Sequence, residues 1–357
     1  MKNFGRLLLI IFLASSLSNC TEETRKRLAP TPIAIGSLNQ VAIVCDQDIW
    51  QGPIGDSISF YFGSAYPILP QPEPWFDLKH FTPEELDAEP TRRELKAYVI
   101  IGDILDEGSL TQKLLAEDIG SERVRRASEE STYNTSVAKD KWAKGQQLIY
   151  LFAKGRDGLQ KAVVDNFPAM AKIIQKYYEP QIDATVYLGG SNGVAINTVQ
   201  KQVKAYINVP TDYKIALEEQ NTIWLRQDTD DATSNILIHR LPYTDQNQFE
   251  KEYVLNIRNQ LGKELISTTI EGTYMQTNDV DLPVFISATQ ISNAYAVEAR
   301  GIWEMVGEFL GGPFISYLVL DEENSELLFI DAFVLAPGER KRNLMLYLEH
   351  IVSTLKL

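Results

Sequence analysis

Three short apolar runs in the first half of the sequence place the strongest constraint on its fold. They are VAIVCD in Gln40–Asp46, AYVIIGD in Arg92–Asp103 and QLIYLF in Gln147–Phe152. Each run is shorter than an ordinary helix and is bounded by polar residues, which is typical of a buried β-strand. The chain therefore needs a sheet, together with other elements that cover the apolar faces of that sheet.

Helical and strand-like patterns alternate along the rest of the chain. Apolar residues recur every three or four positions in Gly158–Tyr178, Asn247–Gly262 and Glu339–Leu355, which predicts three amphipathic helices. From Ala205 on, the segments AYINVP, YKIALEEQ, NTIWLRQD and SNILIHRLPY alternate apolar with polar residues between turn signals. This alternation predicts a meander of antiparallel strands. The fold class that we predict is α+β, with mostly antiparallel sheets covered by helices.

The length of 357 residues suggests two domains, since one domain typically takes about 150 residues. We predict a first α+β lobe at residues 40–180 and a second at residues 181–357. The segments QLIYLFAKGRDGLQKAVVDNFPAMAKII and ELLFIDAFVLAPGERKRNLMLYLEHIV, one in each lobe, both contain a strand, a glycine turn and a helix. An old internal duplication would explain this similarity, and so would the general frequency of strand–turn–helix units.

The N-terminal segment indicates where the chain resides. Lys2 and Arg6 precede the apolar run LLLIIFLA, and small residues follow before Cys20. This order is typical of a secretory signal, and the run is too short to cross a bilayer. A cysteine at this point resembles the lipobox of bacterial lipoproteins, in which the thiol receives a diacylglyceryl group. We expect a signal peptide at residues 1–19 and a lipidated tether at residues 20–39; the alternative is an ordinary cleaved signal before an incidental cysteine.

Lipidation of Cys20 would fix the mature chain to a membrane through fatty acyl chains such as palmitate. Each buried methylene contributes about 0.8 kcal/mol, so that one chain binds marginally and several chains bind firmly. Glu22 and Glu23 resemble the acidic pair that follows the lipidated cysteine in surface-exported lipoproteins of Bacteroidota. A solvated charge pair in a tether has the same sequence. We expect an outer-membrane location and leave both the surface face and the periplasmic face open.

The charge balance excludes polyanionic partners. The sequence carries 34 Lys and Arg residues against 48 Asp and Glu residues, a formal net charge of −14. Such a chain has no electrostatic footprint for nucleic acid or anionic lipid. Of the two cysteines, Cys20 is the expected lipidation site, and Cys45 lies in an apolar run as a small buried residue. Neither a disulfide framework nor a cysteine metal site follows, and we expect no metal and no cofactor.

One glycine-rich stretch in the second lobe is a candidate binding platform. It contains Arg300 and Trp303, followed by Gly311, Gly312 and Phe314. Two glycines before a proline form a backbone turn that side chains would obstruct. One interpretation is a pocket lip on which Trp303 and Phe314 form an aromatic platform. The other is a tight strand connection packed under aromatic side chains.

Motifs for catalysis are weak in this sequence. Neither G-x-S-x-G nor H-E-x-x-H occurs, and Gly189–Gly193 lacks the lysine and the strand context of a phosphate loop. Carboxylate pairs such as Glu218-Glu219 and Asp230-Asp231 are plentiful. Two carboxylates that face each other across a cleft would suit a glycosidase, but most pairs in so acidic a chain are solvated.

Several sequence blocks together resemble a known family. They are VAIVCDQDIWQGPIGDSI, ILPQPEPWFDL, INVPTDYKIALEEQNTIWLRQ, AYAVEARGIWEMVGEFLGGPFISYLVLD and APGERKRNLMLYLEHIVSTLK. With the lipobox, they resemble an uncharacterised family of outer-membrane lipoproteins of Bacteroidota, a domain of unknown function, over nearly the whole mature chain. This resemblance implies a lipoprotein of the outer membrane and brings no activity, cofactor or catalytic residue. The third block also resembles the start of a photosystem-P-like binding domain, which is a fold analogy only.

We therefore expect a non-catalytic, lipid-anchored binding or assembly module of the envelope. Its partner would be an envelope protein complex or a glycan. Binding surfaces are often rich in Tyr and Trp, and the chain has five Trp, 16 Tyr and 14 Phe residues. The alternative is a hydrolase of envelope glycan or peptide that uses carboxylates in a cleft.

Overall fold

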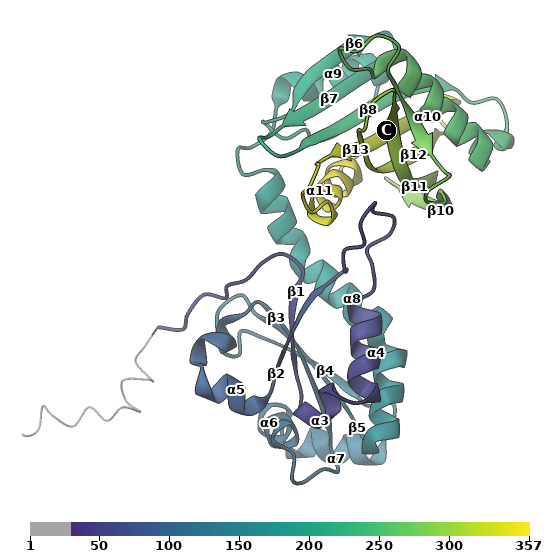
Figure 1. Ribbon diagram of the computed structural model, residues 1–357. Coiled ribbons are helices and arrows are strands. Elements are labelled where there is room, and N and C mark those ends of the chain that lie inside the picture. The colour runs from purple at the N-terminus through teal and green to yellow at the C-terminus, as the bar shows by residue number, and fades with distance from the viewer. Residues whose placement is uncertain (1–29) are drawn as a thin grey trace, which may run out of the picture. The chain divides into compact units, whose positions relative to one another are not determined.

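The computed structural model describes residues 30–357 (Figure 1), so that Cys20 and the predicted signal peptide lie outside the described residues. The described chain forms two compact units. The first unit consists of residues 30–36, Ala42–Asp46 and His80–Gly155, and the second of Ser37–Val41, Gln47–Lys79 and Arg156–Leu357. Within residues 30–357, no helix is both long and apolar enough to cross a membrane.

A mixed five-stranded sheet contains the three apolar runs that predicted strands. Its strands are β1 (Gln40–Val44), β2 (Asp77–Phe81), β3 (Ala97–Asp103), β4 (Thr135–Lys139) and β5 (Gln147–Ala153). Their order is β2-β1-β3-β5-β4. β1 is parallel to β3 and β3 to β5, whereas β4 is antiparallel to β5. All seven residues of β3 are buried, as expected for a strand with both faces covered.

The helices between these strands explain the strand directions. Parallel neighbours need a crossover connection, and helices follow both β1 and β3. The connecting elements are α3 (Gln47–Trp50), α4 (Pro53–Phe62), α5 (Pro83–Ala88), the 3-10 helix η1 (Pro90–Glu94), α6 (Leu110–Ile119) and α7 (Ser121–Glu129). The predicted α+β class is confirmed. The expectation of mostly antiparallel strands is corrected for this one sheet, because the helices after β1 and β3 return the chain so that β3 runs in the same direction as β1, and β5 in the same direction as β3.

Helix α8 (Gly155–Val186) is one continuous helix of 32 residues, longer than the helix predicted at Gly158–Tyr178. Pro168 and Pro180 lie inside it, although a proline removes one helical hydrogen bond. Packing supports the helix on both sides of Pro168. The ring of Phe167 packs edge-on against Phe62 of α4 with centroids 5.0 Å apart, and the Tyr178 hydroxyl donates to the Gln40 carbonyl at 2.6 Å.

An antiparallel sheet of eight strands dominates the second unit. The strands are β6 (Lys214–Glu219), β7 (Thr222–Asp228), β8 (Thr233–Pro242), β9 (Tyr274–Asn278), β10 (Phe285–Ile291), β11 (Ala294–Val306), β12 (Gly311–Asp321) and β13 (Glu326–Leu335). Their order is β10-β11-β12-β13-β8-β7-β6, and β9 also pairs with β11. Three of the four segments of the predicted meander are confirmed, since β6, β7 and β8 are successive antiparallel neighbours. The first segment, AYINVP at residues 205–210, is not a strand and makes only isolated bridges at Tyr206 and Pro210. The two sheets differ in strand order and direction, so the structure gives no support to an internal duplication.

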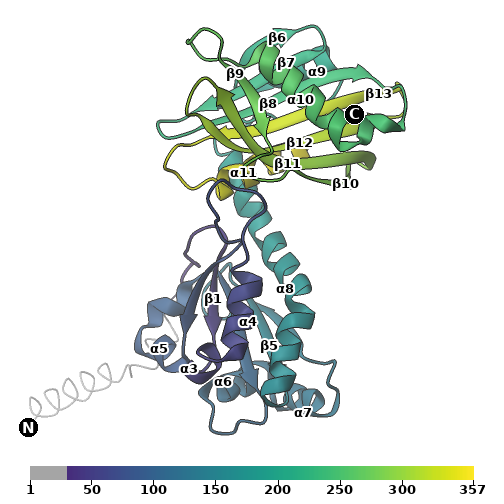
Figure 2. The ribbon, with the colours of Figure 1, turned by 45° about the vertical axis from the view of Figure 1, so that its right-hand side comes forward.

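Helices cover both faces of the eight-stranded sheet (Figure 2). The helices are α9 (Gly193–Val203) and α11 (Arg342–Ser353) on one face, and α10 (Lys251–Leu265), preceded by the 3-10 helix η2 (Gln246–Phe249), on the other. Strand β13 shows the division, because Ile330 and Val334 belong to the core under α9 and α11. Phe329 and Phe333 belong to the core under α10. We call the two sides the α11 face and the α10 face; their alternation follows the period of two along a strand.

Candidate binding site

The five residues of the predicted platform are divided between the two faces of the sheet. Arg300 of β11 is paired with Glu349 of α11, on the α11 face. Trp303 and Phe314 belong to the core of the α10 face, where they are only 4% and 1% exposed. Trp303 and Phe314 are therefore core residues and do not form an exposed aromatic platform.

Gly311 and Gly312 allow close contact between strands. A Cβ atom on Gly312 would lie 2.0 Å from the Val334 carbonyl oxygen, and one on Gly311 would lie 2.6 Å from the Trp303 carbonyl oxygen. No side chain fits at such distances, which is a common reason for glycine inside a strand. The glycines therefore serve the packing of β12 between β11 and β13.

A cavity of about 550 Å³ lies on the α10 face beside Trp303, and we call it the tryptophan cavity. Its walls come from β7, β8, β11 and β13, from the loop after α10 and from the β11–β12 turn. The lining residues are Trp224, Arg226, Thr233, Asn235, Ile266, Ser267, Thr268, Thr269, Trp303, Met305, Glu308, Leu310, Phe333 and Leu335. The volume and the mostly apolar lining are typical of sites for small molecules or side chains.

Hydrogen bonds inside the protein fix the two indole rings of this cavity. The Trp303 Nε1–H donates to the Val334 carbonyl at 3.1 Å, and its ring packs edge-on against Phe333 at 5.7 Å between centroids. The Trp224 Nε1–H donates to Asn235 Oδ1 at 3.0 Å. Because both N–H groups already have acceptors, neither indole offers a free hydrogen-bond donor. Trp303 is buried, so the apolar ring surface that a ligand could contact is that of the partly exposed Trp224.

Polar groups lie at the rim of the cavity. The Arg226 guanidinium pairs with Asp228 at 2.7 Å. In the loop after α10, the Thr268 backbone N–H donates to Thr273 Oγ1 at 3.0 Å, and the Ile270 backbone N–H donates to Thr268 Oγ1 at 3.2 Å. These bonds order the loop that forms one side of the mouth.

A buried charge pair supports the same face of the sheet. The Arg258 Nε–H of α10 donates to Asp331 Oδ1 at 3.0 Å, and both side chains are at most 1% exposed. The Arg258 guanidinium lies 3.7 Å from the Phe314 ring centroid, so that Phe314 serves an internal cation rather than a ligand. Ser316 Oγ also donates to Asp331 Oδ1, at 2.6 Å. Burial lowers the pKa of Arg258, and the Asp331 charge opposes this shift.

A second cavity, of about 390 Å³, lies in the second unit beside α11; we call it the Glu349 cavity. Arg300 donates from Nη1 and Nη2 to Glu349, at 2.9 Å each, and from Nε to Glu298. The Tyr66 hydroxyl also donates to Glu349. Burial raises the pKa of the Glu349 carboxyl to about 8, while the Arg300 contacts favour the ionised form. Arg300 is therefore tied into an ion-pair network.

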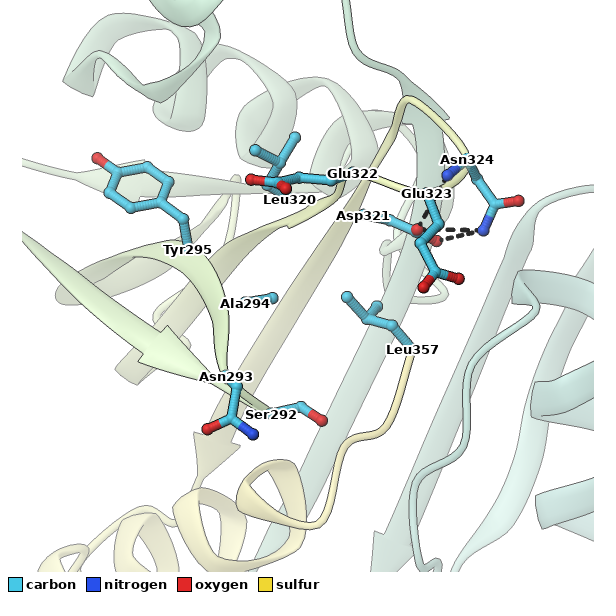
Figure 3. A pocket seen from close by; sticks show the side chains of 10 residues that line it. All are labelled: Ser292, Asn293, Ala294, Tyr295, Leu320, Asp321, Glu322, Glu323, Asn324 and Leu357. Atoms are coloured by element: carbon cyan, nitrogen blue, oxygen red, sulfur yellow. Dashed lines mark hydrogen bonds between the residues drawn. The ribbon is translucent and has the colours of Figure 1, made fainter.

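A third cavity, of about 350 Å³, lies at the other end of the eight-stranded sheet, between the β10–β11 and β12–β13 turns (Figure 3). We call it the turn cavity. Figure 3 shows Asp321 joined to Asn324 by the hydrogen bonds that fold the β12–β13 turn. The buried Arg240 also donates to Asp321, at 2.7 Å. The exposed Glu322 and Glu323 make the turn cavity acidic. Among its lining residues, Asp321 and Asn324 are joined by side-chain hydrogen bonds that belong to the β12–β13 turn.

Many α/β folds bind ligands at the carboxyl ends of their parallel strands. In this sheet, the side chains of Asp46 and Asp103 occupy that position at the ends of β1 and β3. Asp46, after β1, accepts hydrogen bonds from Ser109 Oγ and from the Thr111 N–H at the start of α6. Asp103, at the end of β3, accepts one at 2.8 Å from the Gly155 N–H at the start of α8. Backbone N–H groups at helix starts are the groups that hold phosphates. Because carboxylates of the chain already accept hydrogen bonds from these N–H groups, this edge of the sheet does not suit the phosphates of a nucleotide.

The described residues contain no cluster of three or more His, Cys, Asp or Glu side chains that could hold a metal ion. Two histidines are shifted toward the neutral form. Burial lowers the pKa of His80 and of His239. Thr222 Oγ1 lies 2.8 Å from His239 Nδ1, so this histidine joins neighbouring strands β7 and β8 and lies away from the residues that line the tryptophan cavity.

Comparisons with known proteins match the chain to two families. Residues 34–185 match a family described as a domain of unknown function (DUF8532), and residues 192–354 match another domain of unknown function (DUF4837). Together these matches cover most of the chain, which is consistent with an uncharacterised family. No curated protein matches the sequence significantly.

Two solved structures show a distant similarity. LpqN, involved in cell envelope biogenesis of Mycobacterium tuberculosis, is 14% identical, with 43% of this chain and 82% of that chain covered and a TM-score of 0.27. The Ran-binding protein Mog1p of Saccharomyces cerevisiae is 9% identical, with 43% and 89% covered and a TM-score of 0.28. Similarity at this level identifies neither a ligand nor an activity.

Of the residues that line the tryptophan cavity, the sequence pattern indicated Trp303 alone. Trp224 and Asn235 lie on the neighbouring strands β7 and β8, and Phe333 lies on β13, almost 100 positions further along the chain than Asn235. Each is one more residue of an alternating strand when read alone. Only the strand register, which pairs Phe333 with Asn235, brings them to one place. No local pattern in the sequence marks these residues as a set.

Proposed function

We propose that the chain is a lipid-anchored protein of the outer membrane whose second unit binds an envelope component in the tryptophan cavity. The bound component would be part of an envelope protein complex or a glycan, and the function would be binding or assembly without catalysis. One observation carries this proposal: the partly exposed Trp224, with the buried Trp303 and Phe333 packed in the wall, lines a cavity of about 550 Å³ whose remaining lining is half polar.

The chemistry of the lining supports binding rather than catalysis. Among the lining residues of this cavity in the described chain, Glu308 is the one carboxylate, and neither histidine nor cysteine is present. Asn235 accepts from Trp224 and donates to the Phe333 carbonyl, at 3.5 Å, so that it serves the wall of the cavity. A general acid–base pair needs two titratable groups in reach of one substrate atom.

The proposed anchor rests on the sequence. The lipobox-like segment that ends at Cys20 would place a lipid such as palmitate on the first residue of the mature chain, as in the Bacteroidota lipoproteins that the sequence resembles. The tether that follows would join this lipid to the first described residues.

A photo-crosslinking experiment tests the binding function. We expect a photoreactive amino acid at Thr269, on the rim, to capture a discrete envelope component in living cells. Ser267→Trp places an indole at the mouth and should abolish the crosslink. Ser287→Trp, at an exposed position of β10 that does not line the cavity, is the matched control and should leave the crosslink intact. Equal yields in the two variants would refute the proposal.

A hydrolase of envelope glycan or peptide is the second candidate, and one observation favours it. Glu298 and Glu349 both line the Glu349 cavity, and burial raises the pKa of Glu349 to about 8, as a general acid at neutral pH requires. Both carboxylates are bound to Arg300, however, which gives them a structural partner. Hydrolysis of purified envelope glycan or peptide that Glu349→Gln abolishes and Ser267→Trp leaves unchanged would favour the hydrolase.

A further inference from the structure

We infer that the chain forms a symmetric dimer in which strand β10 of one copy pairs with strand β10 of a second copy. β10 is the outermost strand at one edge of the eight-stranded sheet, and β11 is its one strand neighbour among the described residues (Figure 2). This inference goes beyond the proposed binding function, because no residue of β10 lines the tryptophan cavity.

The turn between β10 and β11 determines which backbone groups of β10 face outward. Ser292 and Asn293 form a two-residue turn, and both have the positive φ that a tight hairpin of this length requires. Such a turn is closed by a hydrogen-bonded pair, here Ile291 and Ala294. Hydrogen-bonded and non-hydrogen-bonded pairs alternate along antiparallel strands, so that every second residue of β10 turns its backbone groups away from β11.

The residues of β10 whose backbone groups face outward are Ile286, Ala288 and Gln290. No hydrogen bond from elsewhere in residues 30–357 reaches the backbone N–H or C=O groups of these three residues. The side chains of Ala288 and Gln290 are also exposed. Such a row of free donors and acceptors is a template for pairing with one more strand.

The other edges of the sheets are protected against such pairing, whereas β10 is not. The segment FISATQI of β10 has no charged residue. β9 occupies the rest of this edge, and α10 closes it, because the Thr277 N–H donates to Asn259 Oδ1 at 2.8 Å. The remaining outermost strands carry charges that disfavour pairing: Asp77 and Lys79 in β2, Lys139 in β4, and Lys214, Glu218 and Glu219 in β6.

The sequence of β10 is complementary to itself in one antiparallel register. When Ala288 lies opposite Ala288 of the second copy, Ile286 lies opposite Gln290 of that copy. These are the residues with outward backbone groups, so that each such pair exchanges both of its backbone hydrogen bonds. Between them Ser287 lies opposite Thr289 of the second copy, and hydroxyl pairs of this kind stabilise neighbouring strands. The register brings no two charges together.

The same register gives the exposed Phe285 a place in the second copy. Phe285 is 57% exposed, and in this pairing it lies opposite Ile291 of the second copy, on the same face of the sheet. Ile291 belongs to the core of the α11 face and, with Tyr317 and Leu346, lines the Glu349 cavity of about 390 Å³. The phenyl ring of each copy therefore enters the cavity of the other, as the twofold symmetry of such an interface requires.

Sedimentation equilibrium of the full-length chain in detergent tests the dimer. We expect the wild type to be dimeric, and Ala288→Lys and Ala288→Glu each to weaken association about tenfold, because each places like charges opposite one another. An equimolar mixture of the two variants should restore the dimer, since lysine then lies opposite glutamate. Ala216→Lys is the matched control, an exposed alanine of the edge strand β6, and should remain dimeric. Phe285→Ser should also weaken the dimer.

Disulfide crosslinking tests the register, in a Cys45→Ala background. A mixture of Ser287→Cys chains and Thr289→Cys chains should crosslink on mild oxidation, because a non-hydrogen-bonded pair brings their Cα atoms to about 4.5 Å. Either variant alone should not crosslink. Two copies of one of these positions are diagonal neighbours, roughly 7–8 Å apart, which is beyond the usual span of a disulfide.

A wild-type chain that stays monomeric at every concentration would overturn the inference, and so would a dimer that Ala288→Lys leaves intact. Crosslinking of Ser287→Cys alone to the level of the mixture would overturn the register. Loss of the dimer should leave the crosslink at Thr269 unchanged, because the tryptophan cavity contains no residue of β10. The dimer and the binding function are therefore decided by separate measurements.

Discussion

At the scale of single residues, the buried ion pair of Arg258 and Asp331 on the α10 face is where a substitution should change the free energy of unfolding most. Asp331 Oδ1 receives Arg258 and Ser316, while Asp331 Oδ2 has no hydrogen-bond partner among the described residues. Removing one charge from a buried pair leaves the other charge without a partner in a medium of low dielectric. We therefore predict that Arg258→Met lowers the free energy of unfolding by about 3–5 kcal/mol.

The double variant Arg258→Met/Asp331→Leu should recover much of this loss, because no buried charge is left without a partner. Urea unfolding of the wild type, the two single variants and the double variant gives the coupling energy of the pair. Lys161→Met is the control, since Lys161 and Asp165 form an exposed pair that is worth about 0.5 kcal/mol or less. A loss in Arg258→Met no larger than that of Lys161→Met would contradict the prediction.

At the scale of elements, the approach of β12 to β13 depends on Gly312. The Cβ atom of an alanine there would overlap the Val334 carbonyl oxygen, which also accepts the indole N–H of Trp303. We predict that Gly312→Ala moves the strands apart and costs about 1–3 kcal/mol of unfolding free energy. Thermal unfolding measures the loss. Gly193→Ala is the matched control, because nothing lies near its Cβ position at the start of α9, and alanine should be neutral or slightly stabilising there. Equal melting temperatures for the two variants would refute the role given to Gly312.

The same elements show what the sequence can and cannot predict. The runs that became β1, β3 and β5 were recognisable because buried parallel strands are continuously apolar. Their direction was missed because it depends on the crossover helices, whose patterns in residues 110–145 are charged and irregular. For the site, Trp303 stood out beside glycines. The burial of Trp303 and its position near Trp224 and Phe333 follow from the register of the sheet. Register pairs residues that are distant in sequence, so it leaves no local pattern.

At the scale of the whole molecule, the proposed anchor and the proposed site belong to different parts of the chain. Cys20 lies outside the described residues, whereas every residue of the tryptophan cavity lies in the second unit. A change at Cys20 should therefore alter location without altering the affinity of the cavity. This separation lets the two halves of the proposed function be tested independently, by fractionation of cells for the anchor and by crosslinking at Thr269 for the cavity.

The prediction at this scale concerns Cys20 itself. The wild-type chain should incorporate an alkyne analogue of palmitate and sediment with the outer membrane, because several acyl chains together bind a bilayer firmly. Cys20→Ala should lose both the label and the sedimentation. Cys45→Ala, which removes the buried cysteine of the same chain, should keep both. Labelling of Cys20→Ala at the wild-type level would exclude the lipid anchor. Protease treatment of intact cells then decides the face: loss of the wild-type chain places it on the surface, and protection until lysis places it in the periplasm, where an assembly role would follow.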